Sequence, residues 1–428
     1  MSIKLEDYAE LLEDLTPHSR EALEANWHEA TKVFSPRGLD NYLKGVSAIR
    51  GLGRGDTLVE TWIEQAPLVA KEVGEDVVAD LATASLMLAS KTSGAVIELL
   101  LATAPTAANR LGDAELFLKY LQFINTLLAQ APRGVRPMLD KLEVLFQHLT
   151  LGGLRRWALW GAHAHRTNYE EQIRYFGLES KESLAMLQKE RKGTLLVDVQ
   201  RRINMYLRAL WARDFFMRPT SGDFEAREGY RPYIADYLLH LPDAYDDWTV
   251  EGQEPVPGIE LYRATAAHCA AHIVETRVPI SAEALNPMQM AVISVIEDAR
   301  VEALAIRRFP GLKQLWSRLH SATPEMSATA GDYLNRLARA LLDERYQDDD
   351  SWINEGRALF AAAQDRLDTN QTSWEIGVQL AHSLTQKKIP FNARTDLLTA
   401  PYRDDNRYFW EFEEFDFNKA ASAGYESV

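Results

Sequence analysis

The sequence predicts an all-α protein in which a helical-repeat solenoid is followed by a second helical domain. Two observations lead to this prediction. Apolar residues recur at helical spacing along most of the 428 residues, and no convincing alternating strand run is present. One segment also repeats at an offset of 38 residues, from position 59 to position 97. Most connections between the expected helices look short and contain Gly or Pro.

The internal repeat relates VETWIEQAPLVAKEVGED (59–76) to IELLLATAPTAANRLGDA (97–114). The matching positions are Glu60 with Glu98, Ala66 with Ala104, Pro67 with Pro105, Ala70 with Ala108, and Gly74 with Gly112. Because Pro lacks a backbone N–H, each Pro is expected to start or kink a helix. Each Gly is expected to end a helix in the left-handed conformation.

An apolar helix is expected after each copy, at 77–90 and at 115–131, and a third, more degenerate unit at 136–162. Helix pairs that repeat about every 40 residues are typical of HEAT-like solenoids, in which each pair covers the apolar face of its neighbour. An irregular bundle with chance similarity is the alternative, but the Pro, Gly and Ala matches fall in one register. We therefore expect a HEAT-like repeat domain over residues 1–165.

The second helical domain is expected over residues 166–400. Its clearest helix covers 193–216, where apolar residues form one stripe and arginines lie elsewhere. Residues 217–258 are rich in Pro, Gly, Asp and aromatic residues and are expected to form an ordered, extended connector. Residues 401–428 begin as an aromatic and acidic tail, expected to pack on the helical body, and then resemble a linker.

Composition excludes several classes of protein. The formal charge of −15, from 47 basic and 62 acidic residues, argues against nucleic acid or an anionic membrane as the main partner. A single cysteine, Cys269, excludes a disulfide framework and favours a cytoplasmic protein. The longest apolar stretches, such as 95–108, are interrupted by Glu98 and Pro105, so no transmembrane helix is expected.

Two histidines four residues apart raise the question of a metal site. His268 and His272 share one face of a helix expected over 260–275, and the next helix is expected to begin with Asn286 as N-cap and Pro287 at its first position. Glu297 lies on the face of that helix most readily turned inward. The three side chains are therefore candidates for a His-His-Glu site with one open position.

A zinc peptidase of the HExxH type also needs a glutamate directly after the first histidine as general base, and here that residue is Cys269. We therefore expect no catalytic residues and do not assign a metal. The favoured alternative is a structural clasp, in which the histidines form hydrogen bonds with Glu297 or Glu302 across a helix pair.

Two further stretches are assigned to loops. GLGRGDT (51–57) lacks the Lys-Ser/Thr of a phosphate-binding loop and is expected to connect two helices. No GxxxxGK[ST] motif occurs in the sequence, so ATP hydrolysis by this chain is not expected. The acidic run QDDDSW (347–352) is expected to be a solvated loop.

Eight stretches, in order, resemble CbbO, the adaptor subunit of the CbbQ–CbbO type of Rubisco activase, and the second half is also similar to NorD. The stretches that resemble CbbO are SPRGLDNYLKG (35–45), LGRGDTLVE (52–60), APLVAKEVGEDV (66–77), LTLGGLRRWA (149–158), LQKERKGTLLVDVQRRINMYLRALWARDFFMRP (187–219), LYRATAAHCAAHIVETRVPISAEALNPMQM (261–290), IEDARVEALAIRRFPGLKQLW (296–316) and PYRDDNRYFWEFEE (401–414). None of them is a catalytic motif by itself.

The resemblance implies an adaptor, not an enzyme, that docks on a hexameric, CbbQ-like MoxR-type AAA+ ATPase. ATP and magnesium would belong to that ATPase, and this chain would need no cofactor of its own. The complex would remodel Rubisco and release inhibitory sugar phosphates. Members of the family carry a C-terminal von Willebrand factor A domain, and the chain is expected to correspond to the portion before it. A NorD-like adaptor for another MoxR target and a degenerate zinc metallopeptidase-like domain are the alternatives.

Overall fold

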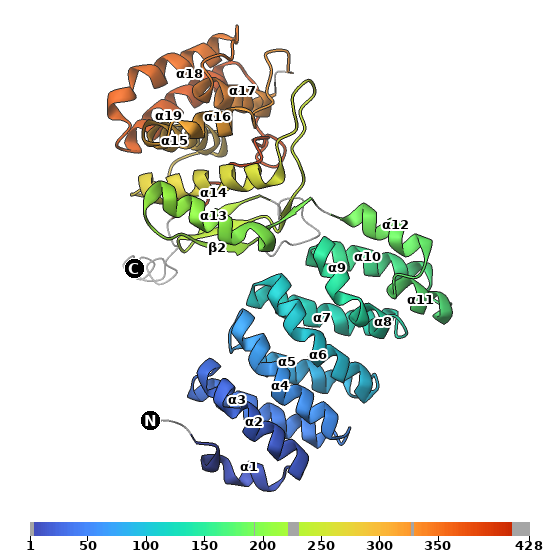
Figure 1. Cartoon of the computed structure of the whole chain (residues 1–428). Coiled ribbons are helices and arrows are strands. Elements are labelled where there is room, and N and C mark those ends of the chain that lie inside the picture. Colours follow the sequence, from blue (N-terminus) through green and yellow to red (C-terminus); the bar gives the residue numbers. More distant parts are fainter. Residues whose placement is uncertain (1–3, 192, 221–230, 327–328, 413–428) are drawn as a thin grey trace, which may run out of the picture. The chain divides into compact units, whose positions relative to one another are not determined.

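The computed structural model describes residues 4–191, 193–220, 231–326 and 329–412, and these ranges are mostly helical (Figure 1). The prediction of an all-α protein is confirmed. The chain divides into two compact units, Met1–Val197 and Asp198–Val428. Among the described helices, none combines the length and the apolar character needed to cross a membrane.

The first unit is a succession of helix pairs. After a 3-10 turn at Leu5–Tyr8, its helices are α1 (Ala9–Glu13), α2 (Pro17–Val33), α3 (Pro36–Gly51), α4 (Asp56–Val73), α5 (Val77–Leu88), α6 (Gly94–Leu111), α7 (Ala114–Gln130), α8 (Val135–Asp140), α9 (Leu142–His148), α10 (Leu151–Ala164), α11 (Tyr169–Phe176) and α12 (Lys181–Glu190). Helix α4 packs between α2 and α6, and α5 packs between α3 and α7 (Figure 1). Stacking of equivalent helices on each other is the arrangement of a helical-repeat solenoid.

The repeated Pro and Gly positions behave differently from each other. Pro67 lies inside α4 and Pro105 inside α6, so neither begins a helix. Gly112 ends α6 in the left-handed conformation, with φ 62° and ψ 11°, as expected. Gly74 ends α4 with φ 98° and ψ 159°, so the expected left-handed conformation is wrong there. Both positions have a positive φ, which a residue without a Cβ adopts at little cost.

Close packing of aromatic residues joins neighbouring helices of the solenoid. Trp62 of α4 is fully buried, and its Nε1–H donates a hydrogen bond of 3.1 Å to the carbonyl oxygen of Tyr42 in α3. The Tyr42 hydroxyl donates in return to the carbonyl oxygen of Ile63 at 2.7 Å. The indole lies against Gly45, where an added Cβ would be 2.1 Å from Trp62 Cζ2. The turn between these helices covers residues 52–55, within the glycine-rich stretch at 51–57 that was expected to connect two helices.

The first unit continues past the domain boundary expected at residue 165. Helices α11 and α12 both pack on α10. The Trp157 Nε1–H of α10 donates to the carbonyl oxygen of Ser183 in α12 at 3.1 Å, and the Tyr175 hydroxyl of α11 donates to the Trp157 carbonyl oxygen at 2.7 Å. These bonds place residues 166–190 in the first unit, so the observed division lies at Val197/Asp198.

The second unit combines helices with short strands. Its elements, with the strand β1 (Thr194–Leu195) just before them, are α13 (Leu196–Trp211), β2 (Phe216–Pro219), β3 (Tyr233–Ala235), β4 (Leu238–Leu241), β5 (Ala244–Tyr245), α14 (Gly258–Glu275), β6 (Ile280–Ser281), α15 (Pro287–Arg308), α16 (Gly311–Ser317), α17 (Ala330–Leu342), α18 (Ser351–Ala362), a 3-10 turn at Gln364–Arg366, α19 (Gln371–Gln386) and β7 (Trp410–Glu411). Strand β4 pairs with β2 in parallel and with β3 in antiparallel orientation. The expected connector at 217–258 therefore contains strands that the sequence analysis missed.

Helix α15 lies at the centre of the second unit and packs against α14, α17 and α19. Its start is as expected, with Asn286 as N-cap and Pro287 in the first turn, and Gln289 completes a capping box. The contact with α19 is close because Gly377 faces the α15 backbone. An added Cβ at Gly377 would be 2.7 Å from Ile293 Cα.

The acidic run at 347–352 is not a solvated loop throughout. The side chain of Asp348 is fully buried and accepts two hydrogen bonds from Arg336 of α17, from Nε at 2.8 Å and from Nη2 at 2.7 Å. The Tyr346 hydroxyl donates to the same carboxylate at 2.5 Å. The expectation was wrong because the buried guanidinium of Arg336, which cannot be recognised from the local acidic run, requires a buried counter-charge.

Candidate metal centre

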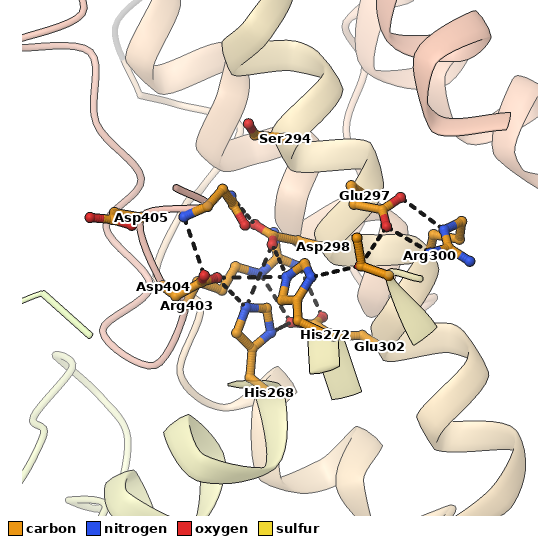
Figure 2. Close-up of polar contacts among 12 residues, drawn as sticks. His268, His272, Ser294, Glu297, Asp298, Arg300, Glu302, Arg403, Asp404 and Asp405 are labelled. Atoms are coloured by element: carbon orange, nitrogen blue, oxygen red, sulfur yellow. Dashed lines mark hydrogen bonds and ion pairs between the residues drawn. The ribbon is translucent and has the colours of Figure 1, made fainter. Parts of the chain in front are cut away.

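Two helices and one irregular segment of turns and bends form the candidate site. His268 and His272 lie one turn apart on α14, and Asp298 and Glu302 lie one turn apart on α15. The segment after α19 supplies Asp404 (Figure 2). The side chains of all five residues are 0–1% exposed to solvent.

Four ligand-type atoms converge at the centre of this cluster. His268 Nε2 lies 3.0 Å from Asp404 Oδ1 and 3.5 Å from Asp298 Oδ1. His272 Nε2 lies 2.8 Å from Asp298 Oδ1 and 3.6 Å from Asp404 Oδ1. One such atom from each of the four residues can be chosen so that all four lie within 4.8 Å of one another. Figure 2 shows the two imidazoles and the two carboxylates directed toward the same place.

The second ring nitrogen of each imidazole, Nδ1, also has a hydrogen-bond partner. His268 Nδ1 is 3.0 Å from Glu302 Oε1, and His272 Nδ1 is 3.1 Å from Thr276 Oγ1. The outer oxygens of the carboxylates are held by Asn406, whose side-chain Nδ2 donates to Asp298 Oδ2 at 3.3 Å and whose backbone N–H donates to Asp404 Oδ2 at 3.2 Å. The orientation of all four side chains is thus determined by neighbours outside the cluster.

Glu297, the third residue considered from the sequence, is directed away from this cluster (Figure 2). Its carboxylate accepts hydrogen bonds from Arg300, from Nε at 2.8 Å and from Nη2 at 2.6 Å. The hydroxyls of Thr276 and Ser373 also donate to it, at 2.7 Å and 2.6 Å. The His-His-Glu combination is therefore not assembled, and Asp298 and Asp404 take the places near the histidines.

A buried ion pair ties the third segment to α15. Arg403 donates to Glu302 from Nε at 3.1 Å and from Nη2 at 2.9 Å. Burial alone would raise the pKa of the Glu302 carboxyl, but the charge of Arg403 and the hydrogen bond from His268 hold that pKa well below its usual range. Glu302 is therefore ionised, and a carboxylate can only accept a hydrogen bond from His268 Nδ1.

The electrostatics of the cluster favour positive charge near His268. Burial lowers the pKa of this imidazole, but the hydrogen bonds with Asp404 and Glu302, together with the charge of Asp298, outweigh burial and raise it to about 9. The Asp404 carboxyl shows the complementary change. Burial raises the pKa of this carboxyl, but the charges of the two histidines and the hydrogen bond with His268 have the larger effect. The pKa of Asp404 is therefore lowered.

The aromatic tail packs on the helical body in its first part. Tyr402 is fully buried, and its ring stacks on Trp316 of α16 with the ring centroids 6.0 Å apart. Phe409 is 1% exposed and joins Ile280 and Ile293 in a small apolar cluster, whereas Phe412 is 66% exposed. The expectation of packing is confirmed up to Phe409. Residues 413–428 of the expected tail and linker lie outside the described residues.

Sequence reasoning missed Asp298, Asp404 and Arg403. One signal for Asp298 was available, because Asp298 and Glu302 have the same four-residue spacing as the two histidines and must share a face of α15. No local signal identifies Asp404, since Asp405 follows it directly and the nearest ligand-type partner in sequence is more than 100 residues away.

No family model, curated protein or solved structure matches this chain. With four nitrogen and oxygen atoms facing one another and no exposed member, the cluster has no position open to a substrate. Either protons or a cation must therefore lie between the imidazoles and the carboxylates.

Proposed function

We propose that this chain is a non-catalytic adaptor that docks on a hexameric MoxR-type AAA+ ATPase of the CbbQ kind, in the cytoplasm. The observation that carries the proposal is the ordered resemblance of eight stretches, between residues 35 and 414, to CbbO. In this role the adaptor couples ATP hydrolysis by the ring to remodelling of Rubisco, and inhibitory sugar phosphates are released from the closed active site.

Two features of the fold agree with an adaptor. Stacked helix pairs expose an extended surface along each side, which is suited to binding another protein. In addition, the cluster of ionisable side chains around His268 and His272 is buried and has no open position. Cys269, at the position where an HExxH peptidase has its general base, is buried as well, and burial raises the pKa of its thiol.

The proposal is tested by binding of the purified chain to purified MoxR-type rings. The tagged chain is mixed with a CbbQ-like ring in the presence of ATP, ADP or no nucleotide, and retention is measured by pull-down and by analytical ultracentrifugation. An AAA+ ring of another class serves as the control. We expect retention that depends on nucleotide and a changed ATPase rate of the CbbQ-like ring only. Absence of both effects in every nucleotide state would overturn the proposal.

The choice between Rubisco and another target needs a separate measurement. The resemblance of the second half to NorD makes a different MoxR target the competing assignment. Reactivation of Rubisco that is inhibited by a sugar phosphate is followed with the ring alone and with the ring plus this chain. Acceleration by the chain supports the Rubisco assignment, whereas ring binding without acceleration supports the NorD-like assignment.

A further inference from the structure

The hydrogen bonds around the histidines determine which ring nitrogen carries a proton. The Thr276 hydroxyl donates its hydrogen to Glu297 Oε1 at 2.7 Å, so toward His272 it can only accept, and His272 Nδ1 must be the donor. His268 Nδ1 faces the Glu302 carboxylate at 3.0 Å and must also be a donor. In the neutral ring the proton is therefore on Nδ1, and the lone pair is on Nε2 in both residues.

Both lone pairs then face carboxylate oxygens. His268 Nε2 and His272 Nε2 each have Asp298 Oδ1 and Asp404 Oδ1 within 3.6 Å. Four acceptor atoms cannot remain this close in a buried site unless positive charge lies between them.

The charges of the neighbouring buried side chains also indicate that positive charge is needed between these atoms. Of the four buried carboxylates, Glu297 is paired with Arg300, and Glu302 is paired with Arg403. Two negative charges, on Asp298 and Asp404, remain and lie next to the imidazoles. A single divalent cation would balance both charges. Protonation of both rings would balance them too, but would place two imidazolium cations with centroids 4.8 Å apart in a site without solvent.

Two of the four nitrogen-to-oxygen separations at the centre of the cluster also match those of a metal site. For zinc bonds of about 2.0–2.2 Å, the ligand atoms of a tetrahedral site are roughly 3.3–3.6 Å apart. The four nitrogen-to-oxygen separations here are 2.8, 3.0, 3.5 and 3.6 Å. The two crossed distances of 3.5 and 3.6 Å fall in this range, whereas the distances of 2.8 and 3.0 Å have the length of hydrogen bonds and would lengthen when the ion binds.

We propose that His268, His272, Asp298 and Asp404 bind one structural zinc ion (Figure 2). Imidazole Nε2 and carboxylate oxygen are zinc ligands, and four protein ligands without an open position are typical of structural sites. The neighbours that a metal-bound histidine needs are present, since Glu302 and Thr276 accept the Nδ1–H groups. This inference is independent of the adaptor function, because it concerns how the second unit is held together.

The ion would join three parts of the second unit. Its ligands come from α14, from α15 and from the segment that contains Tyr402 and Phe409. That segment ends in β7, which pairs with β6 in parallel, so Trp410 lies opposite Ile280. Release of the ion is therefore expected to loosen residues 401–411 before it affects the helices.

Zinc content provides the first test. The chain is purified without an affinity metal and without chelator, and metals are measured by inductively coupled plasma mass spectrometry. We expect close to one zinc per chain, and a loss of at least 80% of it in Asp298→Asn and in His272→Gln. Glu297→Gln is the matched control, because it removes a neighbouring buried carboxylate of α15 that does not face the cluster, and it should keep the zinc.

A second test does not depend on variants that fold. The wild-type chain is treated with a strong chelator, and hydrogen exchange is compared before and after zinc is restored. We expect faster exchange in residues 401–411 and a lower melting temperature after chelation, both reversed by one equivalent of zinc. Cobalt in place of zinc should give the visible absorption of a tetrahedral site.

Two outcomes would overturn the proposal. One is a chain that is isolated without metal and takes up none from a slight excess of zinc. The other is zinc that is bound equally by the wild type and by Asp298→Asn, with no effect of chelation on residues 401–411. Both outcomes would leave protonated histidines in a hydrogen-bonded clasp as the explanation of the cluster. Neither bears on whether the chain binds a MoxR-type ring.

Discussion

The buried pair of Glu302 and Arg403 should be much more sensitive to removal of one partner than to removal of both. Both side chains are fully buried and form two hydrogen bonds with each other, of 3.1 Å and 2.9 Å. Arg403→Met leaves the Glu302 carboxylate buried without its guanidinium partner. Breaking one member of such a pair costs about 3–5 kcal/mol, because the remaining charge is uncompensated.

Glu302→Gln combined with Arg403→Met removes both charges. The introduced amide oxygen can still accept from His268 Nδ1, so the hydrogen bond at the imidazole is kept. We expect the double substitution to be less destabilising than the sum of the two single ones by at least about 2 kcal/mol, as interaction energies within one buried network commonly are.

Hydrogen exchange measured on peptides of α15 is the suitable assay, because it reports the opening free energy of one region in a chain with two compact units. A loss of about 3 kcal/mol corresponds to roughly a 150-fold faster exchange through that opening. Peptides of α4, in the first unit, serve as an internal control and should not change. Additive effects of the two substitutions, or a cost of Arg403→Met below about 1 kcal/mol, would refute the reasoning.

Two other predictions concern packing and pH. Gly377→Ala should lower the free energy of unfolding, measured by urea denaturation, by about 2 kcal/mol, because the new Cβ meets the backbone of Ile293. Gly51→Ala, with open space at that position, should not lower it, and equal effects would contradict the close contact. Arg336 and Tyr346 outweigh burial and hold the pKa of Asp348 at about 2, below its value in the unfolded chain. This depressed pKa stabilises the fold above about pH 4, and the contribution is lost as pH falls toward 2. Asp348→Asn should therefore be less stable than the wild type by about 2 kcal/mol at pH 7, and the two proteins should become similar in stability near pH 2. A difference that does not change between pH 7 and pH 2 would show that the Asp348 charge is not responsible.

The parts of the fold that follow from local rules could be predicted from the sequence. The start of α15 needed only the Asn-Pro pair and the helical spacing that follows it. The helix pairs of the solenoid were indicated by a repeat in which several small residues and prolines keep one register. These features depend on residues close to one another in the chain, and a single sequence contains that information.

Pairings over long distances could not be predicted in the same way. Strand β2 pairs in parallel with β4 over four residues, which is too short for an alternating pattern to be visible. Asp348 lies in an acidic run that is indistinguishable from a solvated loop until Arg336 is placed beside it. The sequence favoured Glu297 over Asp298 because Glu297 lies one turn from Ile293 and Val301. Helix α15 is buried on several sides, so these apolar residues do not define a single inward face.

Helix α14 explains how two histidines with the spacing of a peptidase motif come to lie in a fully buried site. Every residue from Ala264 to His272 is buried, so this part of the helix has no face turned to solvent. A peptidase must admit both a substrate and a water molecule to its metal, and it needs a carboxylate after the first histidine, where this chain has the buried thiol of Cys269. The small residues between and around the histidines instead allow α15 and residues 401–406 to approach closely. The same spacing that presents two ligands to a metal in an open cleft here directs two imidazoles into the interior, where they join three segments of the second unit.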